Sequence, residues 1–131
     1  MPAPRFVAAL VAMTLSATSI AAAAEFEPIK DGDTLTGKLR LLPTRHPNGT
    51  KIEAYQIVSK PRAMPKDDDF CDHDKGAKTF HLIAMKASQR KQLDPLLGKT
   101  ISVKVGSLYC SETAWHIGDV AVSRWELLPS K

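Results

Sequence analysis

The chain has 131 residues, of which 44% are hydrophobic and 24% charged, and its formal net charge is +4 at pH 7. This length fits one domain built around a single hydrophobic core. The charge is too small to indicate a polyanionic partner, so we expect no nucleic-acid binding.

The first 24 residues are typical of a secretory signal peptide. Arg5 is their only charged residue, an apolar run covers 6–13, and four alanines at 21–24 precede Glu25. A basic tip, an apolar core and a small-residue exit define such signals. A membrane anchor is the alternative, but it needs about 20 predominantly apolar residues, and Thr and Ser interrupt the run between 14 and 19. We therefore predict cleavage before Glu25, a periplasmic or secreted product, and no membrane span in the mature domain, residues 25–131.

Two strands and a turn are predicted at the start of the mature domain. Residues 34–42 alternate between apolar and polar side chains, which is the pattern of a half-buried strand. Residues 43–50 contain Asn48-Gly49, a pair that favours tight turns. A second alternating segment, residues 52–59, completes a predicted β-hairpin.

A long loop, a third strand and a short helix follow. Residues 61–78 contain two prolines, a run of acids and Gly76 without a sustained period, so they predict a loop. Residues 79–85 are apolar on both faces and predict a central strand. At 88–97 the period changes to that of a helix, with Ser88 as the expected N-cap and Gly98 as the end. Pro95 allows only a short helix or two turns.

The last third predicts two more strands. Residues 100–106 alternate strictly, and residues 115–125 form a second apolar stretch that is broken near Gly118. The expected order is three strands, one short helix and two strands. This is the order of an all-β, five-stranded OB-like Greek-key barrel with its helix between the third and fourth strands. Another small antiparallel barrel or sandwich is the alternative.

Only two cysteines, Cys71 and Cys110, are present. Exported proteins meet an oxidising compartment in which disulfides persist. We therefore predict a Cys71–Cys110 disulfide, which would tie the acidic segment 67–74 to the strand region around Tyr109.

The C-terminal half resembles a family of small secreted bacterial proteins. Residues 97–108 read LGKTISVKVGSL and are followed by TAWH at 113–116 and VAV at 120–122. This order is similar to the domain of unknown function 4431 family, whose pattern is roughly L-x-G-K-x-V-x-V-x-G-x-L, then T-x-x-H and an apolar strand. By this resemblance His116 occupies the family's histidine position. Ile117 and Gly118 stand where relatives carry a second His and a Thr, which disfavours a metal or catalytic role. The resemblance implies a secreted domain and names no reaction.

The acidic segment 67–74 is the densest chemical signal. Its carboxylates and imidazole could supply a divalent cation with oxygen and nitrogen ligands, and the candidate metal ligands are Asp69, Asp72, His73 and Asp74. The segment does not match the twelve-residue calcium loop, because Gly76 is displaced and no closing Glu follows. A solvated acidic loop is the alternative, and we expect no cofactor.

Enzymatic chemistry finds little support in the sequence. No phosphate loop, serine nucleophile elbow or H-E-x-x-H motif is present. Cys71 with His73, His81 and His116 could form a zinc site or a thiol nucleophile paired with imidazole. Both would need a free thiolate at Cys71, which the predicted disulfide removes. His116, placed in an apolar strand, is expected to be a hydrogen-bonded histidine of the barrel or, alternatively, a ligand. We predict a protein that is not an enzyme.

The sequence therefore favours a small exported binding module, expected to be a monomer. Its partner would be a protein or a cell-envelope component, engaged through the barrel face and the disulfide-tethered loop. The candidate binding residues are Phe70, Tyr109, Trp115 and His116. The alternative is a divalent-metal-binding periplasmic protein that uses the acidic loop.

Overall fold

The computed structural model describes residues 2–4, 11–14 and 26–130. The predicted signal peptide, residues 1–24, falls largely outside these described residues. Among the residues that are described, no helix is both long and apolar enough to cross a bilayer.

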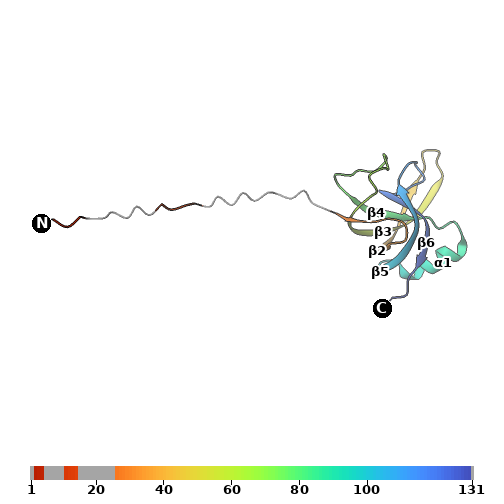
Figure 1. Ribbon diagram of the computed structural model, residues 1–131. Helices are drawn as coiled ribbons and strands as arrows, with labels where there is room; N and C mark the ends of the chain where they lie inside the picture. The colour runs from red at the N-terminus through yellow and green to blue at the C-terminus, as the bar shows by residue number, and fades with distance from the viewer. Residues whose placement is uncertain (1, 5–10, 15–25, 131) are drawn as a thin grey trace.

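Residues 26–130 form a closed β-barrel with one short helix (Figure 1). Its elements are β1 (Glu27–Pro28), β2 (Thr34–Arg45), β3 (Lys51–Ala63), β4 (Ala77–Leu82), α1 (Ala87–Leu93), the 3-10 turn η1 (Asp94–Leu96), β5 (Thr100–Cys110) and β6 (Val120–Leu127). The strands lie in the order β1-β3-β2-β5-β6-β4, and a further pairing of β3 with β4 closes five of them into a barrel. Neighbours are antiparallel except for the parallel β4–β6 and β1–β3 pairs. This arrangement confirms the predicted all-β, OB-like barrel.

The core follows from the alternation of apolar residues along each strand. The barrel core contains Leu35 and Leu39 of β2, Val103 and Val105 of the adjacent strand β5, and Phe80 of β4; none of the five is exposed to solvent. Inward side chains alternate with solvent-facing Thr and Lys on β2 and β5. Burial of such side chains stabilises the barrel by about 1.5–3 kcal/mol each.

The helix differs from the prediction in its place among the strands. It follows the fourth strand of the chain, not the third, because the two-residue strand β1 precedes the strands that the sequence predicted. A two-residue strand has too short a pattern to be detected from alternation. The N-cap is Lys86, not Ser88, and the Gln89 side chain accepts a hydrogen bond from the Lys86 N–H (3.1 Å). Gly98 ends the turn with a positive φ of 82°, as predicted.

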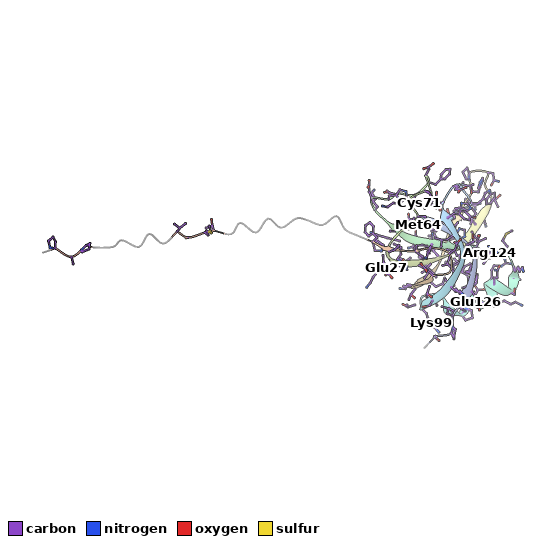
Figure 2. The ribbon with its side chains drawn as sticks, in the orientation of Figure 1. Glu27, Met64, Cys71, Lys99, Arg124 and Glu126 are labelled. Carbon is purple, nitrogen blue, oxygen red and sulfur yellow. A yellow bond between two sulfur atoms is a disulfide. The ribbon has the colours of Figure 1, made fainter. Side chains whose placement is uncertain are left out.

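Three loops project from one end of the barrel, away from α1 (Figure 1). They are the β2–β3 turn at 46–50, the acidic loop at 64–76 and the β5–β6 loop at 111–119. Met64 and Cys71 mark this end in the side-chain view, and Lys99 marks the other (Figure 2). The predicted strand at 115–125 is wrong in its first half, because residues 111–119 form this loop and β6 begins only at Val120.

Candidate functional site

The β5–β6 loop is fastened to the outer surface of β3 and β4 by two buried polar side chains. Gln56 of β3 and His81 of β4 are directly paired across the strands, with 1% and 7% of their surfaces exposed. The Ile117 N–H donates to His81 Nδ1 (3.0 Å), and Gln56 Nε2 donates to the Ile117 carbonyl oxygen. Arg40 Nε completes the set by donating to Gln56 Oε1 (2.9 Å). Both backbone polar groups of Ile117 are thereby satisfied, as buried groups require.

Gly118 and Asp119 fix the end of the same loop. Gly118 has a positive φ of 135°, and a Cβ there would lie 3.0 Å from Thr79 Oγ1 and 3.1 Å from Gln56 Nε2. The Asp119 carboxylate accepts hydrogen bonds from the N–H groups of Lys78 (2.9 Å) and Thr79 (3.2 Å). Only glycine fits this backbone and this space at position 118.

The loop presents two of the predicted binding residues, Trp115 and His116. Trp115 stacks on His46 of the β2–β3 turn, with ring centroids 3.9 Å apart and planes inclined by 21°. His116 Nδ1 accepts a hydrogen bond from the Glu112 N–H (3.1 Å), and its ring meets Tyr109 edge-on at 5.2 Å. The sequence predicted that His116 lies within an apolar strand of the barrel. This prediction is wrong, because His116 lies in the β5–β6 loop.

A shallow pocket of about 320 Å³ opens where this loop meets the β3–β4 surface. This volume is at the lower end of ordinary small-ligand sites. The pocket is lined by Glu53, Tyr55, His81, Leu82, Ile83, Ala84, Met85, Trp115 and His116. We call it the loop pocket.

His81 is the buried ionisable group of the loop pocket. Burial and, to a smaller extent, the neighbouring His116 lower its pKa to about 4. The ring is therefore neutral at pH 7. Because Nδ1 accepts the Ile117 N–H, the proton of the neutral ring is on Nε2. His81 Nε2 has no hydrogen-bond partner among the described residues. Because every fully buried side-chain nitrogen or oxygen of these residues has one, Nε2 is not fully buried, and His81 is one of the residues that line the loop pocket.

Tyr55 forms part of the floor of the loop pocket. Its hydroxyl donates a hydrogen bond to the Asp94 carboxylate. Burial and this bond raise the pKa of Tyr55 to about 12. The hydroxyl is thus engaged in joining β3 to η1, and it serves structure more than ligand binding.

Phe70, another predicted binding residue, lies at a different pocket. Its side chain is 64% exposed on the acidic loop. It lines a surface hollow of about 430 Å³ together with Met64, Lys78, Cys110 and Asp119. The structure therefore places Trp115, His116 and the adjoining Tyr109 together, and Phe70 at a separate hollow.

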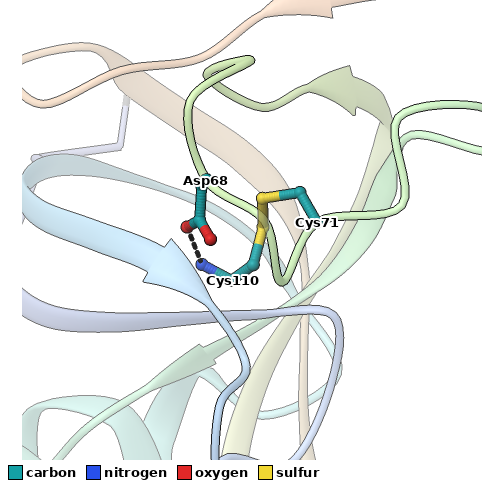
Figure 3. A group of neighbouring side chains, drawn as sticks. All are labelled: Asp68, Cys71 and Cys110. Atoms are coloured by element: carbon teal, nitrogen blue, oxygen red, sulfur yellow. Dashed lines mark hydrogen bonds between the residues drawn. A yellow bond between two sulfur atoms is a disulfide. The ribbon is translucent and has the colours of Figure 1, made fainter.

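The Cys71–Cys110 disulfide is present, as predicted, with Cα atoms 5.3 Å apart (Figure 3). Asp68 lies beside it and accepts a hydrogen bond from the Cys110 N–H (3.1 Å). These three residues are the only group of three metal-ligating side chains within 4.8 Å of one another in the described part of the chain. Sulfurs joined in a disulfide are not thiolates, so the group does not fit a metal ion.

The predicted metal ligands all lie exposed on the acidic loop, at Asp69, Asp72, His73 and Asp74. Asp72 Oδ1 already accepts hydrogen bonds from the N–H groups of Asp74 (3.0 Å) and Lys75 (3.2 Å). The four side chains do not gather into a group of three ligand atoms. Metal binding at this loop stays a prediction.

The sequence did not point to His46 or Glu53 as binding residues, and it offered His81 only as a partner in the disfavoured zinc or cysteine site. His46 was read only as a turn residue. His81 was visible as a polar residue in a strand with two apolar faces, and this is the one signal that could have singled it out. The contact of His46 with Trp115 joins residues 69 positions apart, and no local pattern records it.

Comparison with protein-family models, with curated proteins and with solved structures finds no match to this chain. The resemblance to the domain of unknown function 4431 family therefore stays a prediction.

Proposed function

We propose that this protein is a small exported binding module that engages a protein or cell-envelope component and does no chemistry on it. The observation that carries the proposal is the loop pocket. It combines an exposed aromatic ring, Trp115, with a buried polar side chain, His81, whose Nε2 has no hydrogen-bond partner among the described residues. Convergent polar groups beside apolar surface are what a binding site requires.

The position of the pocket on the barrel supports the same proposal. OB-fold proteins bind ligands on the face of their second and third barrel strands, between the first and last strand-connecting loops. Those strands are β3 and β4 here, and the loops are 46–50 and 111–119. This support is an analogy of fold and does not name the ligand.

Export is part of the proposal, with the periplasm or the exterior as the destination. The disulfide supports it, because such bonds persist in oxidising compartments. The test is the intact mass of the protein from fractionated producing cells, measured without reduction. We expect a chain that begins at Glu25 and lacks two hydrogens in the periplasmic or external fraction. A cytosolic chain that keeps residues 1–24 and free thiols would contradict export.

Binding is tested by immobilising the mature domain and adding isolated envelope fragments or a periplasmic extract. We expect retention that Trp115→Ser abolishes. Lys104→Ser, which alters an exposed side chain of β5 outside the pocket, is the matched control and should retain as much as the wild type. Equal retention by the two variants would contradict this site.

A further inference from the structure

The free hydrogen-bonding groups of the loop pocket are mostly donors. His81 and His116 each use Nδ1 to accept a backbone N–H, so each neutral ring keeps its proton on Nε2. Trp115 adds its indole N–H, which donates to no described residue. The three residues that carry these N–H groups lie on two elements, β4 and the 111–119 loop, and all three line one pocket.

The backbone acceptors along one wall are already occupied. The Ile83 carbonyl accepts from Trp125 Nε1 (3.0 Å), and the Ala84 and Met85 carbonyls accept from the Arg90 guanidinium (3.0 Å each). Among the lining residues, the acidic acceptor that remains is Glu53, an exposed side chain of β3. A ligand here meets three donors and one carboxylate.

The apolar part of the pocket is an aromatic ring held in place. His46 covers one face of Trp115, and 45% of the Trp115 surface stays exposed, which leaves the other face and the ring edges for a ligand. His46 is itself fixed, because its Nδ1 accepts the Asn48 N–H (3.1 Å). The flexible Met85 side chain, 84% exposed, stands at the rim.

Charge and geometry exclude two other ligand classes. A metal ion would need ligand atoms that converge, but His81, His116 and Glu53 do not form a group of three within 4.8 Å in the described chain. An anion would be repelled by Glu53 and would face a His81 ring that is uncharged at pH 7, because its pKa is about 4.

We propose that the loop pocket binds a neutral saccharide unit, whose hydroxyl groups accept from His81 and His116 and donate to Glu53 while its ring lies against Trp115. The inference rests on the proposed function and specifies its ligand class. A sugar ring offers hydroxyls that both accept and donate, together with apolar C–H faces. A sugar ring therefore complements the three donors, the carboxylate acceptor and the aromatic surface of the loop pocket. A carboxylic acid or a metal ion does not complement all of these groups.

The test is a nuclear magnetic resonance titration of the mature, disulfide-bonded domain, observing the indole and imidazole nitrogens. The probes are cellotetraose and tetra-N-acetylchitotetraose as neutral saccharides, tetragalacturonate as the anionic counterpart, and a tetra-alanine peptide. We expect a neutral saccharide to shift the Trp115, His81 and His116 signals in a saturable way.

Two variants remove single donors without unfastening the loop. In His81→Asn and His116→Asn the amide oxygen takes the place of Nδ1 and still accepts the loop N–H, while the Nε2 donor is lost. Each should weaken saccharide binding about three- to tenfold, the range expected for one hydrogen bond. Lys104→Ser should bind as the wild type does.

Each outcome separates the inference from the proposed function. If only tetragalacturonate or the peptide shifts these signals, the saccharide inference fails and the binding module stands. If neither neutral saccharide shifts them, or if both Asn variants bind as the wild type does, the inference also fails. If, in addition, retention of envelope or periplasmic material does not depend on Trp115, the proposed function fails with it.

Discussion

Burial of the His81 ring and the hydrogen bond that its Nδ1 accepts both disfavour the protonated form of this residue. A proton on Nδ1 would break the bond from the Ile117 N–H and place a charge in a buried position. The folded-state pKa is about 4, below the ordinary value of 6.5 that applies to the unfolded chain. Between these values the unfolded state binds more protons, so stability falls as the pH falls from 6.5 to 4 and is unaffected by His81 above that window.

We therefore predict that the unfolding free energy decreases by up to about 3 kcal/mol across this window because of His81 alone, at about 1.4 kcal/mol per pKa unit. Urea denaturation at pH 7, 5.5 and 4.5 measures it. His81→Asn should give a flatter profile, since Asn accepts the same N–H and does not titrate. A variant profile as steep as that of the wild type would show that other groups cause the loss.

Gly37 of β2 is a second residue whose identity is dictated by its neighbours. A Cβ at this position would lie 2.3 Å from the Val58 carbonyl oxygen and 2.7 Å from Ile57 Cγ2. We predict that Gly37→Ala lowers the unfolding free energy by about 2 kcal/mol or more, because the backbones of β2 and β3 must move apart. Urea denaturation is the measurement. Gly106→Ala should cost less, since its nearest neighbour at 3.1 Å is the side-chain Cβ of Arg124 on an exposed surface.

At the scale of elements, the loop 111–119 depends on contacts that come from other strands. Gln56→Ala would leave the Ile117 carbonyl without its donor and Arg40 without its acceptor. We predict faster hydrogen exchange of the Ile117 amide and a broadened Trp115 indole signal. Removing a buried partner should also lower stability by about 1–3 kcal/mol. Thr36→Ala, which removes an exposed hydroxyl contact with Ser102, is the control and should change neither signal.

The elements that could be predicted are those whose pattern is local. The alternation at 34–42 and 100–106 identified β2 and β5, and the change of period at 88–97 identified α1 with η1. The prediction of a strand at 115–119 was wrong because the apolar residues there resemble a strand pattern. The observed loop depends on the positive φ of Gly118, on a hydrogen bond donated by Gln56 and on one accepted by His81. Those partners lie more than 35 positions away.

At the scale of the whole molecule, the disulfide joins the acidic loop to the end of β5. The bond closes a loop with a sequence separation of 39, for which the chain-entropy model gives about 4 kcal/mol. We predict that Cys71→Ala/Cys110→Ala lowers the unfolding free energy by up to this amount in urea. Wild-type protein with a reductant should approach the double variant, and the double variant should not respond to the reductant.

The candidate site was predictable only in part at this scale. Trp115 and His116 were named as candidate binding residues from the sequence, and the structure places both at the loop pocket. The other side of the pocket comes from Glu53 and from residues 81–85, which barrel closure brings there. Phe70 was grouped with them because of the disulfide, yet its loop faces a separate hollow.

The parallel pairing of β4 with β6, which closes the barrel, is where we expect the strands to separate most easily. The parallel β4–β6 seam has three registered residue pairs, against eight between β2 and β3. Its middle pair is His81 with Ala121, so one lining residue of the loop pocket belongs to the shortest seam of the barrel. A ligand held by both His81 of β4 and the 111–119 loop, which leads into β6, would resist the separation of β4 from β6. Its occupancy should therefore be readable as slowed amide exchange along β4 and β6, even without a change of shape.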